Sequence, residues 1–378
     1  MPSKAQPAPA PETTIASARI SAVRIPTDQP ESDGTAAWDS TTVVLIELTA
    51  AGVTGLGFSY TNESAANLSY QLIQKAIIGR DPFDIPSLHS ALDREVRNWG
   101  RPGLVSTAIS AIDICLWDLK ARLLERPLLS LLGRSRSEIP AYGSGGFTSY
   151  TEKQLVDQLT GWAANGLRAV KMKIGRDPDR DLERVSAVQK ALKGRAQLYV
   201  DANGAYTRKQ ALDKATKFGT LAVTWFEEPV TSDDRAGLHM LVEHAPSVMN
   251  IAAGEYCYVL DDARLLIEAQ AVDVLQADVT RCGGITNFLK IGHLCEACHV
   301  PLSAHTSPSI HATLCCTLTS ATNVEYFHDH ARIEEMLFDG ALRPVNGNLR
   351  PDPSRPGLGL DLKRPDAEKF QIFSARVE

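Results

Sequence analysis

The feature that most constrains the fold is a series of short apolar segments that each end in a charged or polar residue. These segments read RAVKMKIG, AQLYVDANG, AVTWFEEP, NIAAGE, AVDVLQAD, HVPLSAH and TNVEYF, with polar ends at residues 173, 201, 227, 255, 278, 305 and 325. The ends are 20 to 28 residues apart, which leaves room for a strand, a helix and two loops in each unit. With IPAYGSG as the first segment, the pattern predicts eight parallel strands, the number that closes a (β/α) barrel of TIM type.

An open, doubly wound sheet is the alternative architecture for such a repeat. It usually has a glycine-rich turn between its first strand and the helix that follows. Here GVTGLG, residues 52–57, lies in the first third of the chain, has a different spacing and precedes no helical pattern. The barrel is therefore favoured.

The remaining sequence is predicted to form a tail and an additional α+β domain. Residues 1–14 are rich in Pro and Ala and are expected to be a disordered tail instead of a signal peptide. Residues 15–138 change from strand-like alternation to helical periodicity, as in an α+β domain. The barrel then occupies residues 139–345. Residues 346–378 contain Pro and Gly turns and are expected to return to the α+β domain.

Composition narrows the classes of function. The formal net charge is −6 and basic residues form no block, so nucleic-acid binding is not expected. No segment approaches the roughly 18 apolar residues of a membrane span. The seven cysteines are an odd number scattered along 378 residues, which is typical of reduced thiols and predicts a cytoplasmic location.

Two lysines interrupt the apolar segment at 168–175. In a barrel covered by helices, outward-facing strand residues are apolar and alternate positions point inward. If Val170 and Met172 face the helices, Lys171 and Lys173 point into the barrel near its C-terminal mouth. Barrels of this type carry their chemistry at that mouth.

Carboxylates end three consecutive predicted strands, at Asp201, Glu227 and Glu255. Consecutive strands of a parallel barrel are neighbours, so these groups should converge, and three converging anions repel unless a cation lies among them. Ligation by oxygen alone favours Mg²⁺ over zinc. The alternative, three independent solvated residues, is less consistent with their nearly constant spacing.

The next strand ends supply Asp278, His305 and Glu325. A lone His at a strand end is usually a satisfied polar residue, but a neighbouring Asp can orient the imidazole and strengthen its basicity. A buried lysine beside a second ammonium group and a metal cation should have a lowered pKa. Lys173 is therefore the predicted base, with Lys171 as its electrostatic partner.

Taken together, these residues resemble the enolase superfamily, and specifically its mandelate racemase-like branch. The resemblance rests on GRPGLVSTAISAIDICLWDLKAR before the barrel, KMK on its second strand, the Asp201, Glu227 and Glu255 set, GGIT after Asp278, and the Asp278–His305 pair. It implies a modified (β/α)7β-like barrel covered by an N-terminal α+β capping domain. It also implies a homo-oligomer.

The resemblance implies a reaction class as well. A small carboxylate substrate binds Mg²⁺, a base removes the proton α to the carboxylate, and an enediolate forms. Lys173 and His305 would be the acid/base pair, and Lys171 would help to neutralise the carboxylate. Glu325 would donate a hydrogen bond to the enediolate, which requires this residue to be buried and protonated.

The fate of the enediolate decides the product. Loss of a β-hydroxyl gives dehydration of an acid sugar, an aldonate or an aldarate, to a 2-keto-3-deoxy acid, and this is the favoured outcome. Racemisation, epimerisation or lactone cycloisomerisation through the same intermediate is the alternative. Loops at 27–39 and about 59–66 are expected to close over the mouth, and the first carries only acidic charges, which favours an aldonate. Asn203, Trp38 and Tyr60 are candidate substrate contacts.

Two rival interpretations are less favoured. HDH at 328–330 suggests an amidohydrolase-like enzyme, but in such enzymes the motif follows the first strand, whereas here it follows the eighth. A non-catalytic barrel would be expected to lose a member of the charged set, and every member is present here.

Overall fold

The computed structural model describes residues 13–378, so all but the last two residues of the predicted tail, 1–14, lie outside the described part. Two segments of alternating residues pair as long antiparallel strands, β1 (Ile15–Ser32) and β2 (Ala37–Ala50). With β3 (Val53–Tyr60) and β15 (Gln371–Val377) they form a sheet in the order β15-β1-β2-β3. The last strand of the chain therefore pairs with the first.

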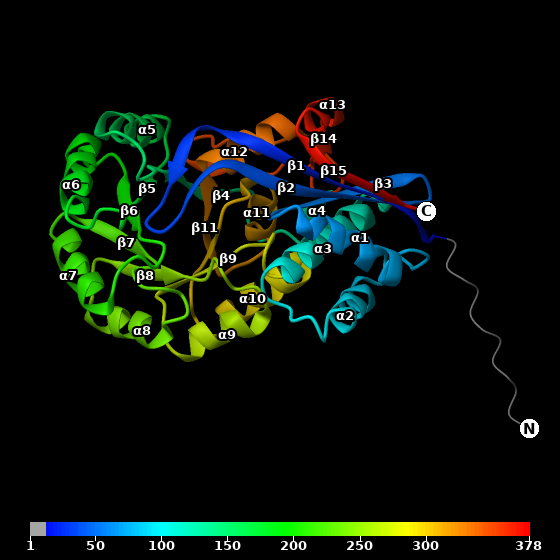
Figure 1. Ribbon diagram of the computed structural model, residues 1–378, viewed down its shortest axis with the longest axis horizontal. Coiled ribbons are helices and arrows are strands. Elements are labelled where there is room, and N and C mark those ends of the chain that lie inside the picture. Colours follow the sequence, from blue (N-terminus) through cyan, green and yellow to red (C-terminus); the bar gives the residue numbers. More distant parts are fainter. Residues whose placement is uncertain (1–12) are drawn as a thin grey trace, which may run out of the picture.

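The two faces of this sheet contribute to different cores because strand residues alternate. Val44, Ile46 and Leu48 pack with helices α1 (Ser64–Ala76), α2 (Ile85–Glu95) and α3 (Leu104–Leu123). The neighbouring Val43 and Leu45 belong to the core that includes the barrel strands. The sheet thus joins its own helices to the barrel (Figure 1).

The barrel has eight parallel strands, and β11 pairs with β4 to close it. The strands are β4 (Ile139–Gly145), β5 (Ala169–Lys173), β6 (Gln197–Asp201), β7 (Val223–Glu227), β8 (Asn250–Ala253), β9 (Val274–Ala277), β10 (Leu302–Ala304) and β11 (Ala321–Phe327). The helices that follow them are α5 (Glu152–Ala164), α6 (Asp181–Leu192), α7 (Arg208–Gly219), α8 (Arg235–His244), α9 (Leu260–Glu268), α10 (Gly284–Ala297), α11 (Pro308–Cys315) and α12 (His328–Leu337). The predicted barrel with an α+β capping sheet is confirmed, and a helix also follows the eighth strand.

Short elements connect these two parts. They are α4 (Leu128–Leu132), β12 (Phe338–Asp339), β13 (Asn348–Leu349), β14 (Asp361–Leu362) and α13 (Arg364–Glu368). Strand β13 pairs antiparallel with β4, and β12 pairs with β14. Within residues 13–378, no helix combines the length and apolar character needed to cross a membrane.

An aromatic layer fills the barrel below its mouth. Tyr199 stacks on Trp225 with ring centroids 5.0 Å apart, and Tyr142 lies edge-on to Tyr199. The Nζ atom of Lys171 lies 5.4 Å from the centroid of the Tyr142 ring. This layer closes the floor of the barrel and leaves the side chains above it to line the mouth.

The expected loop at 27–39 is instead the end of a β-hairpin, which corrects the sequence prediction. β1 continues to Ser32 and pairs Glu31 with Trp38, so only residues 33–36 form the turn. The Asp33 carboxylate stabilises that turn by accepting hydrogen bonds from the backbone N–H groups of Thr35 and Ala36, both at 2.7 Å. The sequence here is polar because the hairpin projects from the cap over the barrel mouth, where Ser32 and Thr148 hydroxyls lie 2.6 Å apart.

Candidate active site

The alternation of β5 directs both of its lysines inward. Lys171 is fully buried, and its Nζ atom lies 2.5 Å from Glu227 Oε1, 2.8 Å from Glu325 Oε1 and 3.5 Å from Asp201 Oδ2. Lys173, the last residue of β5 and nearer the mouth, donates to Asp201 Oδ2 at 2.5 Å. Both lysines therefore point into the barrel, as the sequence pattern suggested, and contact carboxylates of β6, β7 and β11.

Three carboxylates converge at the barrel mouth. Asp201 and Glu227 are the last residues of β6 and β7, and Glu255 lies two residues beyond β8. All three are buried, and one oxygen of each lies within 4.8 Å of the others. Burial and the nearby Asp201 raise the pKa of Glu227 to about 8, because the negative charges are incompletely compensated.

A fourth carboxyl group, which the sequence analysis missed, supports a cation site here. Glu228 is buried beside the other three, and its Oε1 atom has no hydrogen-bond partner among the described residues. Burial and the charges of Glu255, Asp201 and Glu227 raise its pKa well above the usual range. An all-oxygen set with this excess of negative charge suits a hard divalent cation. The two adjacent glutamates of the FEEP segment, Glu227 and Glu228, could have indicated this fourth carboxyl group from the sequence.

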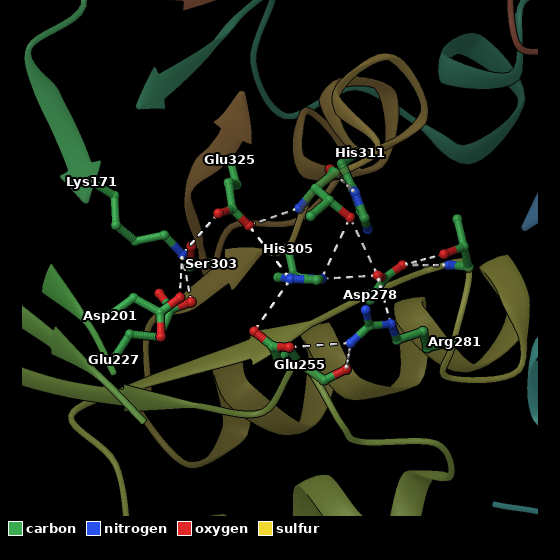
Figure 2. A network of polar contacts seen from close by, with 12 residues as sticks. Lys171, Asp201, Glu227, Glu255, Asp278, Arg281, Ser303, His305, His311 and Glu325 are labelled. Atoms are coloured by element: carbon green, nitrogen blue, oxygen red, sulfur yellow. Dashed lines mark hydrogen bonds and ion pairs between the residues drawn. The ribbon is translucent and has the colours of Figure 1, made fainter. Parts of the chain in front are cut away.

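His305 and Asp278 form a buried pair on the other side of the cluster (Figure 2). The His305 Nδ1 and Asp278 Oδ2 atoms are 2.9 Å apart, while His305 Nε2 lies 3.3 Å from Glu255 and 3.7 Å from Glu325. Burial lowers the pKa of His305, but Glu255, Glu325 and the bond to Asp278 outweigh it and raise the pKa to about 9. The imidazole is thus oriented by one carboxylate and presents Nε2 to two others.

The loops that carry this pair are held by further residues that sequence reasoning did not identify. Arg281 lies with Nη1 3.3 Å from Glu255 Oε1 and Nε 3.5 Å from Asp278 Oδ2, so it bridges two strand ends. His311 of α11 lies 2.9 Å from the backbone N–H of Val279 and 2.7 Å from the carbonyl of Thr306. The position of Arg281, in the loop that follows the strand end at Ala277, could have indicated from the sequence that it lies at the barrel mouth.

The charges of neighbouring residues bear on two of the predicted ionisation states. Burial lowers the pKa of Lys173, but the carboxylate of Asp201 outweighs it and raises the pKa above its usual range. Glu325 is buried as expected, and burial raises its pKa, but Lys171 and His305 lower it to about 2. Lys171 and His305 therefore favour the ionised form of Glu325, whereas donation of a hydrogen bond to an enediolate requires the protonated form.

A cavity of about 330 Å³ lies between the hairpin and this cluster. The three candidate substrate contacts, Asn203, Trp38 and Tyr60, all line it. Trp38 donates its Nε1–H to Glu31 at 2.7 Å, and Tyr60 stacks on His330 with ring centroids 3.4 Å apart.

The lining groups differ between the two ends of this cavity. Among the described lining residues, Lys173 and Arg281 are the only lysine or arginine, and both lie at the carboxylate cluster. The uncharged residues Ser40, Thr41 and Thr61 line the cavity as well.

The HDH segment does not form a single metal site. His328 faces Asp28, with Nε2 2.9 Å from Oδ2, whereas His330 stacks on Tyr60 in the cavity. Asp329 between them accepts a hydrogen bond from Thr41 of the hairpin at 2.5 Å. The two histidines therefore lie in different environments and do not face a common metal position, which argues against the amidohydrolase-like arrangement.

Comparisons with known proteins agree with this geometry. Residues 15–133 match the mandelate racemase/muconate lactonizing enzyme N-terminal domain, and residues 154–367 match the enolase C-terminal domain-like family. The chain is 32% identical over 320 residues to 3,6-anhydro-alpha-L-galactonate cycloisomerase of Streptomyces coelicolor, covering 83% of this chain and 87% of that protein.

Solved structures show the same likeness. A mandelate racemase/muconate lactonizing enzyme-like protein from Rubrobacter xylanophilus is 49% identical with a TM-score of 0.93, covering 95% of this chain and 100% of that one. L-talarate/galactarate dehydratase from Salmonella typhimurium LT2, liganded with Mg and L-lyxarohydroxamate, is 28% identical with a TM-score of 0.89. The match covers 97% of this chain and 94% of that one. The chain therefore belongs to the mandelate racemase/muconate lactonizing enzyme family of the enolase superfamily, whose chemistry proceeds through an enediolate.

Proposed function

We propose that this enzyme dehydrates a monocarboxylic sugar acid, an aldonate, to a 2-keto-3-deoxy acid with Mg²⁺ as its cofactor. The observation that carries the proposal is the pair of acid/base side chains, Lys173 and His305, that reach one cavity beside the carboxylate cluster. A base and a separate acid are what removal of an α-proton and loss of a β-hydroxyl require.

The cofactor would be held by Asp201, Glu227 and Glu255. When bound, Mg²⁺ supplies positive charge that withdraws electron density from the substrate carboxylate and offsets the charge developing on it. The unpaired oxygen of Glu228 and the raised pKa of Glu227 support a cation at this position. The Mg-liganded dehydratase described above has the same fold over 97% of this chain.

Side chains of the protein carry out the proton transfers and compensate charge on the substrate. Lys173 would remove the α-proton in its neutral form, which requires the charge of Asp201 that raises its pKa to be offset by the bound cation. Lys171 keeps a second positive charge beside the cluster, where it can offset negative charge on the substrate. His305 donates its Nε2 proton to the departing hydroxyl, while Asp278 fixes Nδ1 in the protonated form. Glu325, whose ionised form Lys171 and His305 favour, lies 3.7 Å from His305 Nε2 and would support the imidazolium before the proton is transferred.

The choice of an aldonate rests on where positive charge lies in the cavity. Lys173 and Arg281 both lie at the carboxylate cluster, and the hairpin contributes Asp33, Trp38 and neutral hydroxyls. A second substrate carboxylate at the hairpin end would be buried without a cationic partner, which is costly. Lactone cycloisomerisation is a second candidate, favoured by the 32% identity to a cycloisomerase.

The test is a screen of mono- and dicarboxylic acid sugars with Mg²⁺ in D₂O, following keto-acid formation and α-proton exchange together. Lys173→Ala and His305→Asn should each abolish keto-acid formation. The exposed Lys153 and His293 provide matched control variants, Lys153→Ala and His293→Asn, with unchanged rates.

The outcomes separate the candidates. Keto acid from an aldonate that requires both residues supports the proposal. Exchange without keto acid, or conversion of a lactone, favours epimerisation or cycloisomerisation, and turnover of diacids alone refutes the aldonate assignment.

A further inference from the structure

A second cluster of metal-ligating side chains lies where the capping hairpin meets the barrel, apart from the Asp201, Glu227 and Glu255 set. It contains Asp28 and Glu31 of β1 and His328, the first residue of α12. One ligand atom of each lies within 4.8 Å of the others. Two residues from the cap and one from the barrel thus converge although they are 300 positions apart in the chain.

The buried member of this cluster has an unused oxygen. Glu31 is 1% exposed, and its Oε2 accepts the indole N–H of Trp38 at 2.7 Å. Its Oε1 is buried and has no hydrogen-bond partner within residues 13–378. A buried carboxylate oxygen without a donor costs free energy, so an additional group at this position would stabilise the site.

The charges around the cluster also favour a cation. Asp329, which directly follows His328 in the chain, lies close enough to Glu31 to add a further negative charge beside it. Arg332 lies near Glu31 and offsets part of this negative charge, but its Nη2 pairs with Asp329 at 2.6 Å and donates to the carbonyl of Pro26 at 2.7 Å. Asp28 and Glu31 therefore face each other with one imidazole and no lysine or arginine in direct contact among the described residues.

We propose that Asp28, Glu31 and His328 bind a divalent transition-metal ion, such as Zn²⁺, that fastens the capping hairpin to the barrel. One imidazole and two carboxylates form a mixed nitrogen and oxygen ligand set, which suits Zn²⁺ or Co²⁺ better than Mg²⁺. Bonds of about 2.0 Å in a tetrahedral site place ligand atoms about 3.3 Å apart, so the 2.9 Å between His328 Nε2 and Asp28 Oδ2 needs only a small adjustment.

The site would act on the cavity through Trp38. Glu31 holds the indole nitrogen of Trp38, and that ring lines the cavity and packs edge-on against Phe147 with centroids 5.8 Å apart. A metal that fixes Glu31 therefore also fixes one wall of the cavity. This role of the hairpin does not depend on which carboxylate the enzyme converts.

Co²⁺ binding to the full-length protein in excess Mg²⁺ tests the proposal, because Mg²⁺ occupies the all-oxygen site and visible absorption reports Co²⁺ bound to nitrogen and oxygen ligands. Wild type should bind one equivalent of Co²⁺, displaced by Zn²⁺. His328→Gln and Glu31→Gln should weaken binding at least about tenfold. The exposed Asp28→Asn tests the same site with little risk to folding, and His293→Gln is the matched control.

Each result decides the proposal. One equivalent that is lost or weakened in the Asp28 and His328 variants, and retained in the His293 control, supports it. The proposal is overturned if wild type binds no equivalent of Co²⁺ under these conditions. It is also overturned if wild type and the Asp28 and His328 variants bind Co²⁺ with equal affinity. Because the readout is metal binding, failure of this site leaves the proposed dehydration unaffected, and failure of the dehydration leaves this site unaffected.

Discussion

Replacing Asp278 by Asn should disable His305 while leaving the shape of the site unchanged. Asp278 Oδ1 accepts the backbone N–H and the hydroxyl of Thr280 at 2.7 and 2.8 Å, and Oδ2 faces His305 Nδ1 at 2.9 Å. An asparagine oxygen must accept the fixed backbone N–H of Thr280, so its NH₂ group faces the imidazole. His305 Nδ1 then has to accept, and the neutral ring carries its proton on Nε2 without the Asp278 carboxylate to stabilise the imidazolium.

The size of the effect follows from what is lost. A charge-assisted hydrogen bond contributes about 1.5–3 kcal/mol. Loss of a positioned acid/base group typically costs 10²–10⁴-fold in rate. We therefore expect kcat/KM for dehydration to fall about 10²–10³-fold, or about 2.7–4 kcal/mol in transition-state stabilisation.

The assay compares keto-acid formation with α-proton exchange in D₂O for wild type and Asp278→Asn. Exchange that begins at Lys173 should fall less than dehydration, because Lys173 contacts Asp201 and not Asp278. Thr280→Val is the matched control, since it removes a neutral donor from the same carboxylate and keeps its charge. If Asp278→Asn retains kcat/KM within threefold of wild type, the argument for His305 as the acid is refuted.

Three further predictions concern stability. Gly57→Ala places a Cβ against the carbonyl of Ala111 in α3, so the midpoint of thermal unfolding should fall, by an overpacking cost of about 1–3 kcal/mol; an unchanged midpoint contradicts this packing. Burial outweighs the hydrogen bonds from Ser309 and raises the pKa of Glu334 from 4.5 to about 8, so its contribution to stability is complete below pH 4.5 and is lost as the pH rises to about 8. Glu334→Gln should remove that loss in thermal midpoints measured between pH 5 and 8.5, and parallel pH profiles for the two proteins would show the group to be unimportant. Lys171→Met should destabilise the metal-free protein by about 3–5 kcal/mol, because buried carboxylates lose their partner, and Mg²⁺ should restore part of this in unfolding measurements; equal stability with wild type would contradict the pairing.

The sequence alone was sufficient to predict the barrel and the positions of its strand ends. The first predicted strand, 139–145, matches β4, and Lys173, Asp201 and Glu227 are the last residues of β5, β6 and β7. These features are predictable because strand alternation and βα spacing are local properties of the chain, and because a parallel barrel brings successive strand ends together.

Other properties of the site depend on distances that sequence spacing does not contain. The low pKa of Glu325 requires Lys171 at 2.8 Å across the barrel, and a residue's burial alone predicts the opposite direction. Arg281 and Glu228 could be assigned to the site only once the structure showed which charged residues lie beside them.

The sequence determined the fold class, the acid/base residues proposed here and the carboxylate set, because each follows from periodicity along one segment and from the order of strands. Only the tertiary structure decided how the cap meets the barrel. The hairpin of β1 and β2 lies over the mouth through contacts such as Thr41–Asp329 and Asp28–His328, which join residues about 300 positions apart. Such contacts are set by the packing of two separately formed cores, so the cavity wall, the charge states and the second ligand cluster emerge only when the chain is folded.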